Sequence, residues 1–142
     1  MNMKDERQFV GYSKYRSRLV DGHVHTELCP HGSGDRTAMM IEKAIELRIE
    51  KVCLTEHAPL PTAFAAEYGG DKKAYDTASL KLNEVDTYLE LGRQLQRAYG
   101  THIDISLGFE VDYIPGFESD IQEFLDRYGP LTDDNILSVH FM

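Results

Sequence analysis

The chain has 142 residues, of which 42% are hydrophobic and 27% charged. This composition is typical of a single folded globular domain and excludes disordered, collagenous and coiled-coil chains. The formal net charge of −9 disfavours binding to nucleic acid, and no apolar run reaches the roughly 18 residues of a membrane span.

The N-terminal residues and the cysteines of the chain indicate the cellular compartment in which it is expected. The first residues, MNMKDERQFVGY, are polar and lack the apolar stretch of a secretory signal. Cys29 and Cys53 are too few for a disulfide framework, so reduced thiols are expected. We therefore expect a cytoplasmic protein.

Short apolar runs alternate with helical patterns along the chain. A strand is predicted over Leu19–His25, followed by a helix over Arg36–Leu47 with Asp35 as its N-cap. A second strand, Lys51–His57, ends before two prolines. The polar segment 58–78 is predicted to be a long loop, and loops of that length are usually functional or disordered.

The second part of the chain repeats the alternation. A helix is predicted over Ser79–Tyr99 and a strand over Ile103–Tyr113. A further helix, Phe117–Tyr128, precedes a last strand over Asn135–Met142. This order predicts an α/β fold with parallel strands, organised as one domain over residues 1–142.

Imidazole or carboxylate groups follow each predicted strand at its carboxyl end. The first strand ends in His23 and His25, the second in His57, the third in Glu110 and the fourth in His140. Because parallel strands bring their carboxyl ends to one edge, these groups are expected to converge where α/β folds build their sites. Such a set suits a multinuclear metal site bridged by a carboxylate.

The histidine pair of the first strand is the first element of that site. His23 and His25 are two residues apart, so their imidazoles point to the same face of the strand. This spacing alone is a weak signal, but His31 follows six residues later, before a glycine. Cys29, its neighbour, could be suspected as a nucleophile. It has no identifiable base, so it is interpreted as a small residue in a tight loop.

Three further carboxylates are candidates for orienting a ligand rather than binding metal. Asp21 precedes the histidine pair by two residues, and Asp112 follows Glu110 by two, so each shares a face with a candidate ligand. Glu56 adjoins His57 but points to the opposite face of a regular strand. We therefore expect it to make a supporting contact.

Four blocks of sequence carry a resemblance to a known family. They are VDGHVHTELCPHGSGD, KVCLTEHAPLP, LGFEVDYIPG and NILSVHF. In order and spacing they resemble the PHP (polymerase and histidinol phosphatase) phosphoesterases, and within that family the monofunctional histidinol-phosphate phosphatases. The resemblance implies the N-terminal half of a distorted (β/α)7 barrel and three divalent ions of zinc, iron or manganese.

The resemblance also implies which residues bind the ions. It assigns six ligands, all near strand ends: His23, His25, His31, His57, Glu110 and His140. The first two match ligands of one ion, the next two match an outlying ion, and Glu110 matches the catalytic bridge between two ions. The reaction implied is hydrolysis of L-histidinol phosphate, a small phosphorylated substrate, in histidine biosynthesis.

The chain departs from the family pattern near its end. The family's last ligands, a histidine on the next strand and an Asp-x-His pair, have no counterpart up to Met142. We therefore expect the 142-residue chain to be the N-terminal half of a barrel and inactive alone. Inner-face residues such as Val24, Leu54 and Val139 are then expected to lack cover.

Three alternative functions stay open. The chain could be another PHP phosphoesterase, an amidohydrolase-like metal hydrolase, or an inactive metal-binding fragment. Amidohydrolases also open with a histidine pair on their first strand but commonly use a bridging lysine. Glu110 at the bridging position therefore favours the PHP interpretation.

Overall fold

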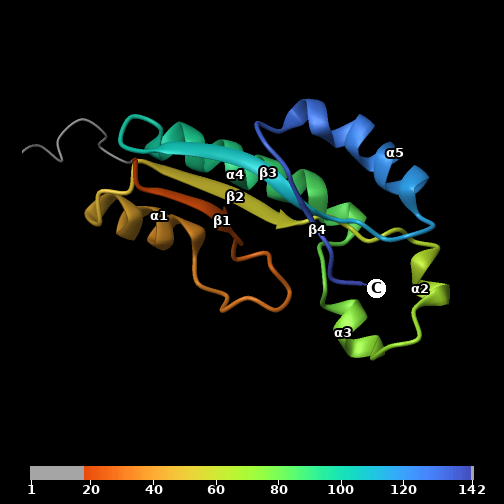
Figure 1. Cartoon of the computed structure of the whole chain (residues 1–142). Helices are drawn as coiled ribbons and strands as arrows, with labels where there is room; N and C mark the ends of the chain where they lie inside the picture. Colours follow the sequence, from red (N-terminus) through yellow and green to blue (C-terminus); the bar gives the residue numbers. More distant parts are fainter. Residues whose placement is uncertain (1–17, 142) are drawn as a thin grey trace, which may run out of the picture.

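The computed structural model describes residues 18–141, in which four parallel strands form one sheet in the order β1-β2-β3-β4 (Figure 1). The strands span Val20–Val24, Lys51–His57, Asp104–Asp112 and Ile136–Ser138. Residues 1–17 and Met142 lie outside the described residues. The N-terminal segment, in which the sequence predicts no secretory signal, is part of this range. The sheet confirms the predicted parallel α/β class.

Five α-helices lie between the strands in the described part of the chain, three of them between β2 and β3. They are α1 Thr37–Glu46, α2 Phe64–Glu67, α3 Lys72–Asp76, α4 Val85–Tyr99 and α5 Glu118–Tyr128, with short 3-10 turns at Leu82–Glu84 and Gly129–Leu131. In Figure 1, α4 runs behind the sheet and α2 and α3 lie beyond the carboxyl ends of the strands. No helix within residues 18–141 is long and apolar enough to cross a membrane.

The two faces of β3 carry different residues because side chains alternate along a strand. The odd-numbered residues from Ile105 to Val111 lie in the hydrophobic core. There Phe109 packs on Tyr88 of α4 and Phe124 of α5, with ring centroids 5.1 Å apart in both pairs. Glu110 therefore belongs to the opposite face of the strand.

Tyr88 ties α4 to both central strands just before their ends. Its hydroxyl donates to the carbonyl oxygen of Gly108 at 2.6 Å and accepts from the backbone N–H of Glu56 at 3.3 Å. Tyr88 is fully buried, and this burial raises the pKa of its hydroxyl. The strands are thus fixed relative to each other where their polar residues begin.

Two glycines of the core allow close approach of neighbouring layers. A Cβ atom on Gly92 of α4 would overlap the side chain of Leu107, and one on Gly108 would overlap the carbonyl oxygen of Asp134. The second contact lies just before β4. Gly108 therefore decides how closely the segment leading into β4 lies against β3.

The segment 58–78 is not the loop that its composition predicts, because it contains α2 and α3. Phe64 of α2 is buried in a second apolar cluster with Ile114 and Phe117. Asp71 caps α3 by accepting from the backbone N–H of Lys73 at 2.9 Å. One buried ring and one cap thus give local structure to a polar sequence.

Several predicted boundaries shift. The N-cap of α1 is Arg36, because the Asp35 carboxylate accepts from the hydroxyl of Ser33 at 2.9 Å instead. The helix predicted from Ser79 begins at Val85, after a 3-10 turn. The last strand ends at Ser138, so the residues that follow it continue without regular structure.

The predicted exposure of three apolar residues is partly wrong. Leu54 is fully buried in the core, and Val24, its partner in the sheet, packs against that core. Both alternate with histidines that face the other side, so they lie on the helix-covered face. Val139 is 54% exposed, as the sequence predicts.

Candidate metal centre

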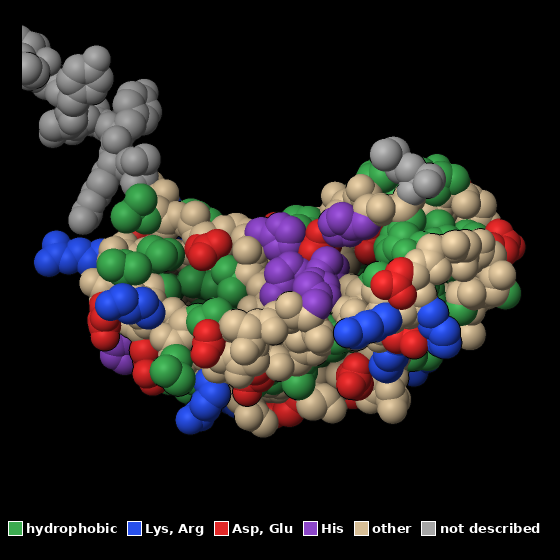
Figure 2. Space-filling view, turned by 90° about the horizontal axis from the view of Figure 1, so that it is seen from below, with side chains coloured by type: hydrophobic (Ala, Val, Ile, Leu, Met, Phe, Trp, Pro, Cys, Tyr) green, Lys and Arg blue, Asp and Glu red, His purple; other side chains and the backbone are tan. Residues whose placement is uncertain are grey.

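Glu110 lies at the centre of a group of imidazoles. It is buried on β3, in register with His57 at the end of β2. Its Oε2 lies 2.9 Å from Nε2 of His23, 3.2 Å from Nε2 of His25 and 3.3 Å from Nδ1 of His57. Figure 2 shows histidine side chains gathered in the hollowed middle of one face.

The second carboxylate oxygen of Glu110 faces the segment after β4. Nε2 of His140 lies 3.5 Å from Oε1 of Glu110. Asp112 accepts hydrogen bonds from Nδ1 of His140 at 2.8 Å and from its backbone N–H at 3.3 Å. Asp112 therefore orients the His140 ring so that Nε2 points to Glu110.

Glu56 performs a similar task for the first strand. It is fully buried and accepts from Nδ1 of His25 at 3.0 Å, from the N–H and hydroxyl of Thr26 at 2.8 and 2.7 Å, and from the N–H of His57 at 3.1 Å. Nε2 of His25 is thereby left free to face Glu110. Glu56 is thus a supporting carboxylate, on the side of His25 away from the cluster centre.

His31 stands at the edge of the group. Its Nδ1 donates to the carbonyl oxygen of Thr77 at 2.8 Å, which leaves Nε2 with a free lone pair. The rings of His31 and His57 have centroids 5.0 Å apart. His31 is exposed, and no group of three candidate ligands within 4.8 Å of one another in the described residues includes it.

Asp21 does not join the cluster. It is exposed, and its side chain makes no hydrogen bond within the described residues. It lines a separate groove with Val24, Met40 and Leu47. The pairing of β1 with β2 loses its register between Asp21 and Val24, so the regular alternation that predicts a shared face with His23 does not hold here.

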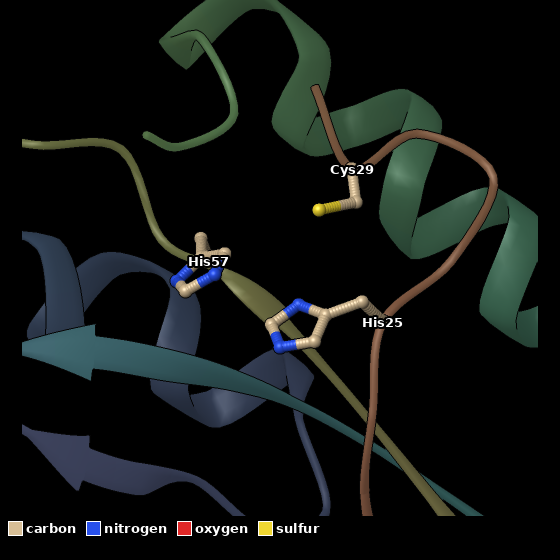
Figure 3. Close-up of side chains that lie close together, drawn as sticks. All are labelled: His25, Cys29 and His57. Carbon is tan, nitrogen blue, oxygen red and sulfur yellow. The ribbon is translucent and has the colours of Figure 1, made fainter. Parts of the chain in front are cut away.

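Cys29 was not predicted to lie at the site. Its Sγ and one nitrogen each of His25 and His57 lie within 4.8 Å of one another (Figure 3). A turn closed by the Cys29 N–H donating to the carbonyl oxygen of Thr26 at 3.1 Å returns the thiol to the histidines. Its position between His25 and His31 is a signal in the sequence.

The ionisation of the group favours a cation. Burial alone would raise the pKa of Glu110, but the hydrogen bond from His23 and the charge of His57 lower it below its usual value. Burial lowers the pKa of His57, which favours the neutral form of its imidazole. An ionised carboxylate beside a neutral imidazole is the form in which both residues bind metal.

A further observation fits a metal ion. Nδ1 of His57 is buried, and no hydrogen-bond partner for it occurs within residues 18–141. A buried polar atom without a partner is costly, by about 1–3 kcal/mol. Two of the three candidate ligand groups in the described residues contain His57, one with His25 and Cys29 and the other with Asp112 and His140.

An open cavity of about 520 Å³ adjoins His140. The rings of Phe64, Tyr68 and Phe141 line it, and Glu67 adds a carboxylate. The ring centroids of Tyr68 and Phe141 lie 5.6 Å apart. Such a cavity suits a flat ring that carries a positive charge.

Comparisons with known proteins agree on one family. The PHP domain model matches residues 21–142. Histidinol-phosphatase of Bacillus subtilis is 41% identical over 122 residues, which are 86% of this chain and 44% of that protein. The chain thus spans less than half the length of this curated relative.

Two solved structures are also similar. The hisK crystal structure from Listeria monocytogenes matches with a TM-score of 0.85 and 43% identity, over 87% of this chain and 45% of that one. The histidinol phosphate phosphatase of Lactococcus lactis, complexed with zinc, L-histidinol and phosphate, matches with a TM-score of 0.65 and 26% identity, over 88% and 41%. The four strands and their helices correspond to the N-terminal half of a PHP barrel.

Proposed function

The chain belongs to the PHP domain family, and from this premise we propose that it carries the N-terminal part of a metal-dependent phosphatase. The reaction is hydrolysis of L-histidinol phosphate to L-histidinol and phosphate. The observation that carries the proposal is the convergence of imidazoles from three strand ends on the buried carboxylate of Glu110. The zinc, histidinol and phosphate bound by the Lactococcus protein support the same chemistry.

Six side chains are proposed as metal ligands: His23, His25, His31, His57, Glu110 and His140. His23 and His25 would hold one ion together with an oxygen of Glu110, and His140 lies next to the other oxygen of that carboxylate. His31 and His57 would hold an outlying ion. The proposed complement is three divalent ions of zinc, iron or manganese, in a protein of the cytoplasm.

When bound, divalent ions generate hydroxide from water at neutral pH and withdraw charge from the phosphate. The residues of the chain hold the site ready for this chemistry. Glu110 stays ionised, because the imidazoles around it offset the cost of its burial. Glu56 and Asp112 each fix one imidazole tautomer and leave the opposite nitrogen free. No nucleophile from the chain is required.

The cavity beside His140 is proposed to hold the organic part of the substrate. The rings of Tyr68 and Phe141 offer faces for an imidazole, and the Glu67 carboxylate offers a partner for the ammonium group. The phosphate then lies towards His140 and Glu110. This orientation explains why an aromatic cavity adjoins a polar cluster.

The test replaces the matched part of the Bacillus relative with residues 21–142 of this chain. The hybrid protein supplies the remainder of the barrel from a known relative. We expect it to release phosphate from L-histidinol phosphate with zinc or manganese, and to lose that activity after chelation. The unmodified relative is the positive control.

Substrate specificity separates the outcomes. A folded hybrid that cleaves a phosphodiester or p-nitrophenyl phosphate but not L-histidinol phosphate contradicts the proposed substrate. A folded hybrid that binds no divalent metal contradicts the metal centre itself.

A further inference from the structure

A groove of about 310 Å³ lies between α1 and β1, and apolar side chains form most of its lining. Three buried residues contribute to it, Ile41 and Ala44 of α1 and Val52 of β2, and Leu47 of α1 lines it while 58% exposed. In Figure 1, α1 lies beside β1, at the edge of the sheet away from β4. An exposed apolar groove of this kind indicates a surface that another segment covers.

One carboxylate in the groove has no hydrogen-bond or ion-pair partner among residues 18–141. Asp21 is in register with Val52, so its side chain lies on the same side of the sheet as α1. The other charged residue of the lining is Lys43, and it is paired with Glu46 at 2.7 Å. The groove therefore suits an apolar segment that also carries a positive charge.

The N-terminal segment 1–17 has this composition. It contains four basic and two acidic side chains, in a chain whose net charge is −9. Its second half, FVGYSKYR, places the rings of Phe9, Tyr12 and Tyr15 three residues apart and adds the cations of Lys14 and Arg16. The PHP domain model matches residues 21–142, so this segment lies outside the match to the family.

The segment joins the fold at one end of the groove. Arg18 pairs with the carboxylate of Glu50 at 3.1 Å, and the carbonyl oxygen of Leu19 accepts from the N–H of Glu50 at 2.8 Å. Glu50 directly follows Ile49, which lines the groove. The 10 residues of α1 span about 15 Å, whereas Phe9–Arg16 in extended form spans about 26 Å. The segment is therefore long enough to return along the whole of α1.

We propose that the segment Phe9–Arg16 docks in the groove between α1 and β1 of its own chain. Its aromatic rings cover the apolar lining, and one of its cations pairs with Asp21. Docking stabilises β1 at the edge of the sheet, and β1 carries His23 and His25. The inference does not depend on the proposed metal centre.

The test places a fluorescent probe in the segment. The chain contains no tryptophan, so Tyr12→Trp reports on this position alone. Indole emission moves to shorter wavelength when the ring leaves water, and we expect this shift in the folded full chain relative to the same chain in urea. Leu47→Lys should abolish the shift. It replaces an apolar contact with a charge of the same sign as the segment, which should lower the ratio of docked to undocked chains by about tenfold or more.

Met39→Lys is the matched control. Met39 lies on the same helix and has the same exposure of 58%, but it does not line the groove. The shift should therefore survive this change. A second measurement leaves the groove unaltered and stands if Leu47→Lys does not fold: we expect nuclear Overhauser contacts between the indole of Tyr12→Trp and the methyl groups of Met40 and Leu47, which both line the groove.

Four results would overturn the proposal. Equal emission in the folded chain and in urea, without Overhauser contacts, shows that the segment stays in water. Equal loss of the shift in Leu47→Lys and Met39→Lys shows that the groove is not the docking site. A shift that grows with protein concentration assigns the groove to a second copy of the chain. A shift that disappears when residues 1–142 are joined to the C-terminal half of the Bacillus relative assigns the groove to the remainder of the barrel.

Discussion

Glu110 presents its two carboxylate oxygens to different imidazoles. Oε2 faces His23, His25 and His57, and Oε1 faces His140. A carboxylate with this geometry can bridge two cations. A neutral side chain of the same size, such as glutamine, cannot bridge two cations in this way. The negative charge of Glu110 is therefore the feature to test.

Replacing Glu110→Gln in the hybrid enzyme keeps the side-chain volume and removes the charge. We expect turnover of L-histidinol phosphate to fall by at least about 10²-fold, the loss typical of removing one electrostatic element of a site. Steady-state phosphate release checks this, with exposed Glu46→Gln as control. Unchanged turnover in Glu110→Gln contradicts the bridging role.

Glu56 acts through His25 and is a positioning residue. Glu56→Gln keeps an acceptor for Thr26 but removes the charge that fixes Nδ1–H of His25. We expect zinc affinity to fall by about 10–100-fold, measured by competition with a chelating dye. Glu50→Gln, at the opposite end of the sheet, should bind as the parent does. If Glu56→Gln has parental zinc affinity and a normal circular dichroism spectrum, the positioning role is wrong.

At the scale of elements, β4 and the segment before it depend on Gly108. The carbonyl oxygen of Asp134 occupies the place of a β-carbon there. The side chains of Asp133 and Asn135 also hold this segment, by accepting from the N–H groups of Leu107 and Phe109 at 2.9 Å each. The position of His140 thus follows from a contact on β3.

Gly108→Ala should displace the segment before β4 and, with it, His140. We expect weaker zinc binding and a loss of about 1–3 kcal/mol in the free energy of unfolding, typical of overpacking. Urea denaturation and zinc titration measure the two effects. Gly129→Ala is the control, because a β-carbon there meets nothing within 4 Å. Equal behaviour of the two variants contradicts the proposed dependence.

The short helix α2 brings Glu67 and the ring of Phe64 to the cavity beside His140. In the hybrid, Glu67→Gln should raise KM for L-histidinol phosphate by up to about fivefold, because an exposed ion pair contributes modestly. KM for p-nitrophenyl phosphate, which has no ammonium group, should stay unchanged. An equal rise for both substrates places Glu67 outside the substrate pocket.

At the scale of the whole molecule, the described residues form a sheet with two edges and a histidine cluster on one face. Among the described residues, β1 and β4 each pair with a single strand. Apolar side chains are exposed at both edges, with Val20 of β1 51% and Leu137 of β4 68% exposed. Such edges favour pairing with another strand.

The 142-residue chain alone should therefore associate and show no significant phosphatase activity. Light scattering of the zinc-loaded chain and a phosphate-release assay measure the two properties. Leu137→Lys should reduce association without restoring activity, because a charge blunts a strand edge. A compact monomer of the unmodified chain that hydrolyses L-histidinol phosphate as fast as a full-length relative contradicts the expectation.

Hydrophobic periodicity in the sequence predicts the part of the candidate site that lies at the strand ends. Parallel strands place His23, His57 and Glu110 at one edge, because the alternation of strands and helices leaves few other arrangements. The contact of Glu56 also follows from alternation within a strand. Asp21 does not follow it, because a break in register is a property of the pairing of β1 with β2.

The sequence by itself determined the parallel α/β order and the residues at the strand ends. Hydrophobic periodicity is a local property of each strand or helix, and it does not depend on which other elements pack against it. Only the tertiary structure decided that Cys29 joins the histidines and that α2 and α3 interrupt segment 58–78. Each of these depends on contacts between residues distant in sequence or on the close packing of side chains. Such contacts leave no periodic pattern in the sequence. They form only when the helices and the sheet pack together.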